Sequence, residues 1–183
     1  MLRTSVAFFA AFVLGCAMPA RAEGSGAALS HNVEQARAAL DHGSWDAYAP
    51  FYTWHAPWAY SRSRRDELND FPFGGGIGRS VADTNGDRHS VYALAFRDSH
   101  YKAQYMAGYA KTTYWPAEGE LRFGLGYTLF LFARSDIGGY VPLPFGAALA
   151  SVRYREAELM VAAIPGTRHS GNVALVFARW SWD

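Results

Sequence analysis

The chain has little cysteine and no strong net charge, and both features exclude classes of function. Its 183 residues contain one cysteine, Cys16, and 17 Lys and Arg against 16 Asp and Glu, so the formal net charge is +1. This even balance gives no support for a nucleic-acid partner, because binding phosphates requires concentrated positive charge. A single cysteine closes no internal disulfide, so stability must come from packing or from a membrane.

Recognisable catalytic and cofactor signatures are also missing. The sequence contains no Gly-x-Ser-x-Gly nucleophile elbow and no cofactor motif. Its 6 histidines show no close metal-ligand spacing. The sequence therefore predicts neither a cofactor nor a metal site.

The first 22 residues have the pattern of a cleavable export signal. Residues 6–18 are apolar and lack acids, and Ala20-Arg21-Ala22 has the small-x-small form that signal peptidase recognises. The run is too short to span a membrane comfortably. A lipoprotein cleavage box ending at Cys16 is the alternative, but the alanine site is the better match. We expect residues 1–22 to be removed, and residues 23–183 to form one domain.

Residues 30–42 predict a short N-terminal α-helix. Val33, Ala36 and Leu40 recur at helical spacing, and Arg37 interrupts their stripe, so the helix is weakly amphipathic. Two placements stay open for it, on a membrane surface or docked on the protein itself.

Beyond Tyr48 the apolar period becomes that of a strand. In residues 121–131, leucine, phenylalanine and tyrosine occupy one face of the predicted strand. The first residues on the other face are small or polar. Eight such segments lie between turn-forming residues, near 48–60, 72–83, 89–98, 102–115, 120–133, 145–154, 156–164 and 172–182.

This pattern predicts an all-β fold, an eight-stranded antiparallel transmembrane β-barrel over about residues 48–182. A soluble lipocalin-like barrel is the competing interpretation, with its apolar face turned inside. The even strand count, the export signal and the aromatic strand ends favour the membrane. An eight-stranded barrel can hold side chains or one slender ligand. Apolar residues on the second face, such as Phe130 and Phe132, indicate an apolar ligand.

Six segments carry a specific resemblance. They are TWHAPWAY, FPFGGGIG, ALAFRDSHYK, MAGYAKTTYWP, YVPLP joined to LASVRY, and IPGTRHSGN. In this order and spacing they are similar to the signatures of the PagP family, outer-membrane lipid A palmitoyltransferases. The resemblance implies a barrel with an N-terminal amphipathic helix. It also implies transfer of a palmitoyl chain from the sn-1 position of a glycerophospholipid to a hydroxyacyl chain of lipid A.

The resemblance implies three catalytic residues, His55, Asp98 and Ser99. Acyl transfer needs a proton acceptor for the attacking hydroxyl and stabilisation of the developing oxyanion. We expect His55 to be the base and Asp98 to orient or polarise it. In a direct transfer, Ser99 is expected to position or polarise the reacting groups. A covalent acyl-serine is the alternative.

The resemblance also indicates how lipid enters. Ala110 replaces a glycine that forms the floor of the family's acyl pocket, and Met106 and Tyr109 are expected beside it. Prolines in or beside strands each remove a ladder donor, and in the family they open lateral gates for lipid. The prolines in such places here are Pro50, Pro72, Pro142, Pro144 and Pro165. Ordinary strand-end proline is the alternative for each.

The implied partners are a glycerophospholipid donor, a lipid A acceptor and outer-membrane lipid, around a monomer or weak homodimer. A noncatalytic barrel, or one that binds lipid without transforming it, stays open as an alternative.

Asp83 and His89 match polar positions of the family, and predict either a loop hydrogen bond or a role at the periplasmic end. Arg62, Arg64 and Arg65 predict a solvated loop or contacts with lipid A phosphates.

Overall fold

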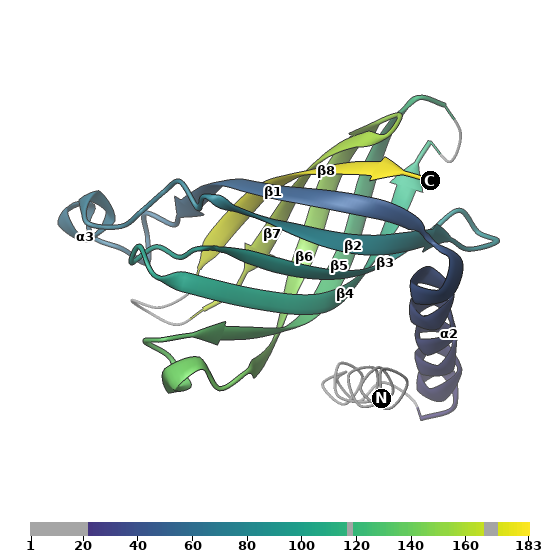
Figure 1. Ribbon diagram of the computed structural model, residues 1–183, viewed down its shortest axis with the longest axis horizontal. Helices are drawn as coiled ribbons and strands as arrows, with labels where there is room; N and C mark the ends of the chain where they lie inside the picture. The colour runs from purple at the N-terminus through teal and green to yellow at the C-terminus, as the bar shows by residue number, and fades with distance from the viewer. Residues whose placement is uncertain (1–21, 117–118, 167–171) are drawn as a thin grey trace.

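The structure is a computed structural model that describes residues 22–116, 119–166 and 172–183, with side chains from residue 26 onward. In these residues eight antiparallel strands close into one barrel, and β8 pairs with β1 (Figure 1). They are β1 (Ser44–His55), β2 (Gly74–Ala82), β3 (Arg88–Arg97), β4 (Ala103–Trp115), β5 (Leu121–Arg134), β6 (Leu143–Tyr154), β7 (Ala157–Ile164) and β8 (Val173–Trp182). The predicted fold class is confirmed. The predicted signal, residues 1–22, falls outside the described residues except for Ala22.

Helix α2, Ala22–His42, precedes the barrel and extends further toward the N-terminus than the predicted 30–42. It docks on the protein, the second of the two placements that the sequence left open. Arg79 of β2 donates hydrogen bonds to the carbonyl oxygens of Leu40, at 2.5 Å, and Gly43, at 2.6 and 3.0 Å. Within the described residues, none of the helices combines the length and apolarity needed to cross a bilayer.

Strand β1 departs most from its predicted bounds. It occupies Ser44–His55 rather than 48–60. The strand ends at His55 because the chain turns directly afterwards, where the backbone N–H groups of Ala59 and Tyr60 both donate to the carbonyl oxygen of Ala56, at 3.0 and 3.1 Å. The turn leaves His55 as the last strand residue, at the rim of the barrel.

The two ends of the barrel are built differently. A short helix, α3 (Arg62–Asp66), lies in the connection between β1 and β2, at the end of the barrel opposite α2 (Figure 1). We call the end with α3 the loop end and the end with α2 the helix end. The turns that join β2 to β3, β4 to β5 and β6 to β7 lie at the helix end.

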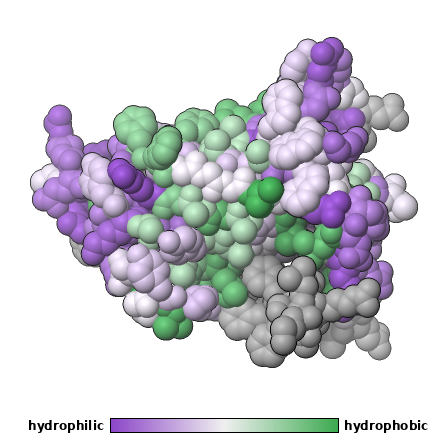
Figure 2. Space-filling view, viewed as in Figure 1, coloured by the Kyte–Doolittle hydropathy of each residue, from purple (hydrophilic) through white to green (hydrophobic). Residues whose placement is uncertain are grey.

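Apolar side chains cover the outside of the barrel. Leu121, Phe123 and Leu125 of β5 are 50, 55 and 59% exposed, whereas Gly124 and Thr128 are buried. Figure 2 shows hydrophobic residues gathered across the middle of the molecule, between more hydrophilic ends. This confirms the predicted outward apolar face, which is the reverse of the soluble lipocalin-like arrangement.

The inside of the barrel divides into two zones. The apolar half, toward the loop end, contains Tyr48, Leu94, Phe96, Met106, Ala110, Phe130, Ala147, Leu149, Met160, Ala162, Leu175 and Phe177. The polar half, toward the helix end, contains Asp46, Ser80, Arg88, Thr112, Ser151, Glu158, Arg179 and Ser181, all buried. The site below lies at the loop end, above the apolar half.

Candidate active site

His55 is the centre of a hydrogen-bonded cluster at the loop end. It is 4% exposed, because the connection after β1 folds over it. Its Nε2 lies 2.9 Å from Ser99 Oγ, and its Nδ1 lies 2.8 Å from Asp70 Oδ1. The ring of Tyr60 meets the imidazole edge-on, at 5.5 Å between centroids. The predicted neighbours His55 and Ser99, 44 residues apart, are therefore brought together.

The carboxylate beside His55 is Asp70, which corrects the expectation that Asp98 orients the imidazole. Asp98 shapes the turn after β3 instead. Its Oδ1 accepts the backbone N–H groups of His100 and Lys102 at 2.8 and 2.9 Å. Asp98 therefore holds the backbone that carries Ser99, because these bonds satisfy donors on either side of the turn.

Asp70 reaches His55 because backbone hydrogen bonds fasten its loop to β1 and to the turn after β3. The carbonyl oxygen of Asp70 accepts the backbone N–H of Thr53 in β1, at 2.8 Å. Its neighbour Asn69 donates a backbone hydrogen bond to the carbonyl oxygen of Ser99, at 2.9 Å. These bonds tie the β1–β2 connection to both parts of the cluster, so its geometry is set by backbone as well as by side chains.

The cluster has the chemistry of a general base. An ionised carboxylate only accepts hydrogen bonds, so contact with Asp70 places the proton of a neutral imidazole on Nδ1. Nε2 then carries the lone pair and faces the Ser99 hydroxyl. Such a nitrogen can take a proton from Ser99 or from another hydroxyl that enters the same position.

An enclosed apolar pocket lies inside the barrel. Met106 and Ala110 line it, together with Tyr48, Tyr92, Leu94, Thr128, Phe130, Leu149, Met160, Ala162, Ile164, Leu175, Phe177 and Arg179. Ala110 lies where the apolar lining gives way to Thr128 and Arg179, so it stands at the border between the two halves. This position agrees with that of a floor residue.

Tyr109 does not share the pocket face with its neighbours, which corrects the expectation that it lines the acyl site. Successive strand residues point to opposite sides of the sheet. Met106 and Ala110 point inward, whereas the Tyr109 hydroxyl meets Asn32 of α2, at 3.1 Å, on the outer side. Tyr109 is buried because the helix covers it.

The barrel wall is incompletely paired at two places near the loop end. The β1–β2 ladder runs only from Ser44–Ser80 to Tyr48–Gly76, whereas β1 pairs with β8 from Trp45 to His55. The β6–β7 ladder ends at Ala148–Ala163, while β6 continues beside β5 to Leu143. Pro50 and Pro72 flank the first gap, and Pro144 and Pro165 flank the second. Pro142 lies in the connection before β6.

The second gap leads toward the interior. A groove on the outer surface crosses β5 to β8 and is lined by Trp54, Trp58 and Pro165, among others. Thr128 and Ile164 border both this groove and the enclosed pocket. The outer groove and the inner pocket therefore adjoin each other at this gap.

Sequence reasoning missed Asp70 and Asn69. Both belong to a loop segment whose residue types, Asn-Asp before Phe71-Pro72, are those of an ordinary turn. The available signal was a carboxylate close in sequence to His55, but the fold-back that joins them depends on contacts between distant strands. Without the fold, Asp98 beside Ser99 was the stronger candidate.

A closed β-barrel with an apolar pocket inside it and a His–Asp–Ser cluster at its rim fits the class of β-barrel acyltransferases. The family model described as "Antimicrobial peptide resistance and lipid A acylation protein PagP" matches residues 35–179. The chain is 39% identical over 142 residues to "Lipid A acyltransferase PagP" of Bordetella pertussis, covering 78% of each chain. It is 39% identical over 153 residues to "Lipid A palmitoyltransferase PagP" of Escherichia coli, covering 82% of this chain and 81% of that one. The chain belongs to the PagP family, and the predicted enzyme class, an acyltransferase, is confirmed.

Proposed function

We propose that the protein transfers a palmitoyl chain, or one of similar length, from the sn-1 position of a glycerophospholipid to a hydroxyacyl chain of lipid A. The observation that carries this proposal is the 2.9 Å contact between His55 Nε2 and Ser99 Oγ, at the rim of a barrel whose interior contains an apolar pocket. An acyl donor needs both parts, a dry space for its hydrocarbon and a base beside its ester. The names of the relatives support lipid A as the acceptor.

In the proposed reaction His55 removes the proton from the lipid A hydroxyl. The resulting oxygen attacks the ester carbonyl of the phospholipid, and a new ester bond forms. The bond to the sn-1 glycerol oxygen breaks, and that oxygen takes the proton back from His55 to give a lysophospholipid. Asp70 holds the imidazole and stabilises its charged form, and the Ser99 hydroxyl positions the reacting groups.

A covalent route through acyl-Ser99 uses the same base. In that route the Ser99 oxygen attacks first, and the lipid A hydroxyl then attacks the acyl-serine. Incubation with the phospholipid alone separates the two routes. A protein mass increased by one acyl group would assign the covalent route, whereas an unchanged mass, in protein that transfers the acyl group once lipid A is added, assigns direct transfer.

The proposed location is the outer membrane, after export by a cleavable signal, with the loop end at the outer leaflet. The apolar belt of Figure 2 supports a membrane, and its aromatic residues at strand ends, such as Trp115 and Trp180, suit an interface. The two side gaps near the loop end suit lipid entry from the bilayer. Recovery of the folded protein in a soluble periplasmic fraction, free of detergent and lipid, would contradict this location.

The test of the function uses purified protein in detergent, labelled phospholipid and lipid A. Wild-type protein should transfer label to lipid A, which distinguishes the enzyme from a noncatalytic or lipid-carrying barrel. His55→Ala and Ser99→Ala should each lower the rate by about a hundredfold or more. Heat-dependent gel mobility checks that both variants keep the folded barrel. Near-normal turnover in either folded variant would contradict the assignment.

A further inference from the structure

Two histidines and one aspartate converge outside the barrel at the helix end. His31 lies on α2, Asp83 in the turn between β2 and β3, and His89 near the start of β3. His89 is completely buried and the Asp83 side chain is 1% exposed, whereas the His31 side chain is 41% exposed. The cluster is therefore closed by the barrel on one side and reachable by solvent beside His31.

The three side chains aim ligand atoms at a common point. Asp83 Oδ2 lies 3.2 Å from His31 Nε2 and 3.2 Å from His89 Nε2. All three ligand atoms lie within 4.8 Å of one another, and the imidazole planes meet at 80°. In a tetrahedral zinc site with bonds near 2.0–2.1 Å, neighbouring ligand atoms are about 3.3–3.4 Å apart. Two of the three separations, at 3.2 Å, are close to this value.

Hydrogen bonds behind the cluster hold two of the ligands. Asp83 Oδ1 accepts the backbone N–H groups of Asn85 and Asp87 at 2.9 and 3.0 Å, which leaves Oδ2 directed at the imidazoles. His89 Nδ1 lies 2.6 Å from the hydroxyl of Tyr109. Metal ligands are typically oriented by partners of this kind, a donor on the second carboxylate oxygen and a polar group on the other ring nitrogen.

Hydrogen bonds of Tyr109 also connect the cluster to α2. The Tyr109 hydroxyl donates to Asn32 Oδ1 at 3.1 Å, while Asn32 Nδ2 donates to Tyr127. Tyr109 therefore lies between α2 and His89 Nδ1 and helps to orient the His89 ring, whose Nε2 faces Asp83 Oδ2. Metal ligands bind in their deprotonated forms, so a bound cation would take the place of any proton shared between Asp83 Oδ2 and His89 Nε2.

The geometry points to a divalent transition-metal site formed by His31, Asp83 and His89, with Zn²⁺ as the best-matched ion. Two imidazole nitrogens and one carboxylate oxygen suit zinc, whereas magnesium and calcium prefer oxygen ligands throughout. A water would complete four-coordination on the exposed side of His31. Because one ligand belongs to α2 and two to the barrel, the bound ion would fasten the helix to the wall. The sequence predicted no metal site, since the ligands lie 52 and 6 residues apart.

Neighbouring charges favour this cluster over the other one of similar composition. Lys111, whose charge would oppose a bound cation, is paired with Asp87 at 2.7 Å. At the loop end, Asp98, His100 and Asp136 also lie together, but the Arg134 guanidinium already pairs with both carboxylates, at 3.3 and 2.7 Å. That second group is therefore already paired with a permanent cation, whereas Asp83 pairs with the two imidazoles that would be its fellow ligands.

The experiment uses tag-free protein, refolded in detergent and stripped of metal, then titrated with Zn²⁺ against a competing chelator. We expect one Zn²⁺ per chain, and His31→Ala and Asp83→Asn should each weaken binding tenfold or more, since even supporting residues of metal sites contribute that much. His42→Ala removes an exposed histidine from the same helix and should leave the affinity unchanged. Zn²⁺ should raise the thermal midpoint of wild type and His42→Ala but not of His31→Ala.

Two results would overturn the site. One is a wild-type protein that holds no stoichiometric Zn²⁺ at micromolar free metal. The other is a folded His31→Ala variant with wild-type affinity, which would assign the bound ion to other histidines. Neither measurement uses acyl transfer, so the site stands or falls independently of the proposed function.

Discussion

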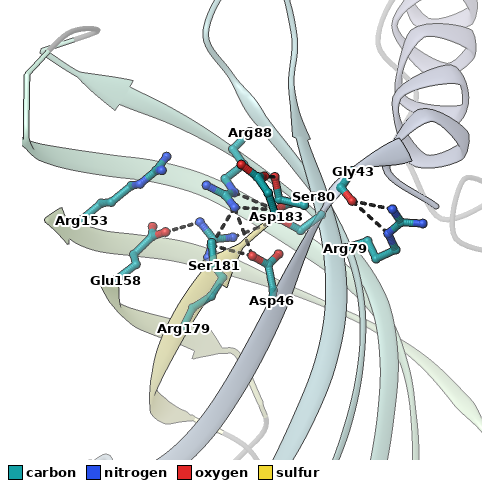
Figure 3. Close-up of polar contacts among 12 residues, drawn as sticks. Gly43, Asp46, Arg79, Ser80, Arg88, Arg153, Glu158, Arg179, Ser181 and Asp183 are labelled. Atoms are coloured by element: carbon teal, nitrogen blue, oxygen red, sulfur yellow. Dashed lines mark hydrogen bonds and ion pairs between the residues drawn. The ribbon is translucent and has the colours of Figure 1, made fainter. Parts of the chain in front are cut away.

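The two halves of the barrel interior differ in what fills them: buried charged and polar side chains in one, and apolar side chains in the other. In the polar half, Arg88 donates to Asp46, Ser80 and Ser181, at 2.6–3.1 Å, and Arg179 pairs with Glu158 (Figure 3). The apolar half is lined mostly by hydrocarbon and aromatic side chains around a pocket. Charged groups with satisfied partners resist entry of hydrocarbon, because any chain that displaced them would leave them unpaired. The polar half therefore forms the closed bottom, or floor, of the apolar pocket, and the apolar half surrounds the pocket itself.

The floor should carry more of the stability than the pocket does. Arg179 is 3% exposed and also donates to Ser90 and Tyr114, each at 3.1 Å. Arg179→Ala leaves Glu158 buried without its cation, and breaking a buried pair in this way costs about 3–5 kcal/mol. We expect the unfolding midpoint in detergent to fall accordingly. Arg153→Ala is the control, since Arg153 is partly exposed at the same end. Equal midpoints for the two variants would contradict a floor of this kind.

The second prediction concerns the rim above the pocket. Asp70→Asn removes the carboxylate that fixes the proton on His55 Nδ1, and should lower the acyl transfer rate by roughly tenfold to a hundredfold. The loss should be smaller than for His55→Ala, because the Asp70 side chain is 43% exposed and water can partly replace it. The expected change is in kcat rather than in KM, with normal gel mobility.

Asp70→Glu is the matched variant, because it keeps the charge and should recover part of the rate. Asp98→Asn should act differently, by loosening the turn that carries Ser99. An Asp70→Asn enzyme with wild-type kcat would show that the carboxylate is not a positioning residue.

The sequence predicted the barrel well because strand alternation is a local property. In β5 the exposed Leu121, Phe123 and Leu125 were all on the expected face. The same two-residue period would have excluded Tyr109 from the pocket, since it adjoins Ala110 and must face the other way.

The sites needed long-range contacts that no local pattern encodes. Asp70 was missed because backbone hydrogen bonds from Thr53 and to Ser99 fold its loop over β1. The cluster of His31, Asp83 and His89 was missed because α2 docks beside the β2–β3 turn. Sequence spacing detects ligands within one element, whereas both clusters combine residues of separate elements.

The third prediction tests the border between the halves. If the acyl chain ends against Ala110, the added methyl group raises the floor relative to glycine, and Ala110→Gly should favour a longer chain. One buried methylene is worth about 0.8 kcal/mol, so the preference between neighbouring lengths should change about fourfold. The measurement is transfer from phospholipids that differ only in acyl length. Identical length profiles would show that the floor lies elsewhere.

The smallest expected effect is a pH dependence of stability that comes from a partly exposed ion pair at the loop end. The buried ion pairs of the polar half should not show it. Burial alone would raise the pKa of Asp136, but hydrogen bonds and charge from Arg134, with His100 nearby, outweigh it and lower the pKa from its ordinary value of 3.8. Because the folded pKa is the lower one, ionised Asp136 stabilises the fold above the ordinary value. This contribution is lost as the pH falls through the folded pKa.

Asp136→Asn should therefore reduce the fall in thermal midpoint between neutral pH and pH values below the ordinary pKa. The difference should be small, since a third of the Asp136 side chain is exposed and water screens the pair. Arg179 and Glu158 lie inside the barrel, so their contribution should persist until the whole barrel unfolds. Superimposable profiles of thermal midpoint against pH for wild type and Asp136→Asn would show that the Arg134–Asp136 pair adds no stability. Asp98 would then be the acidic partner that matters for Arg134.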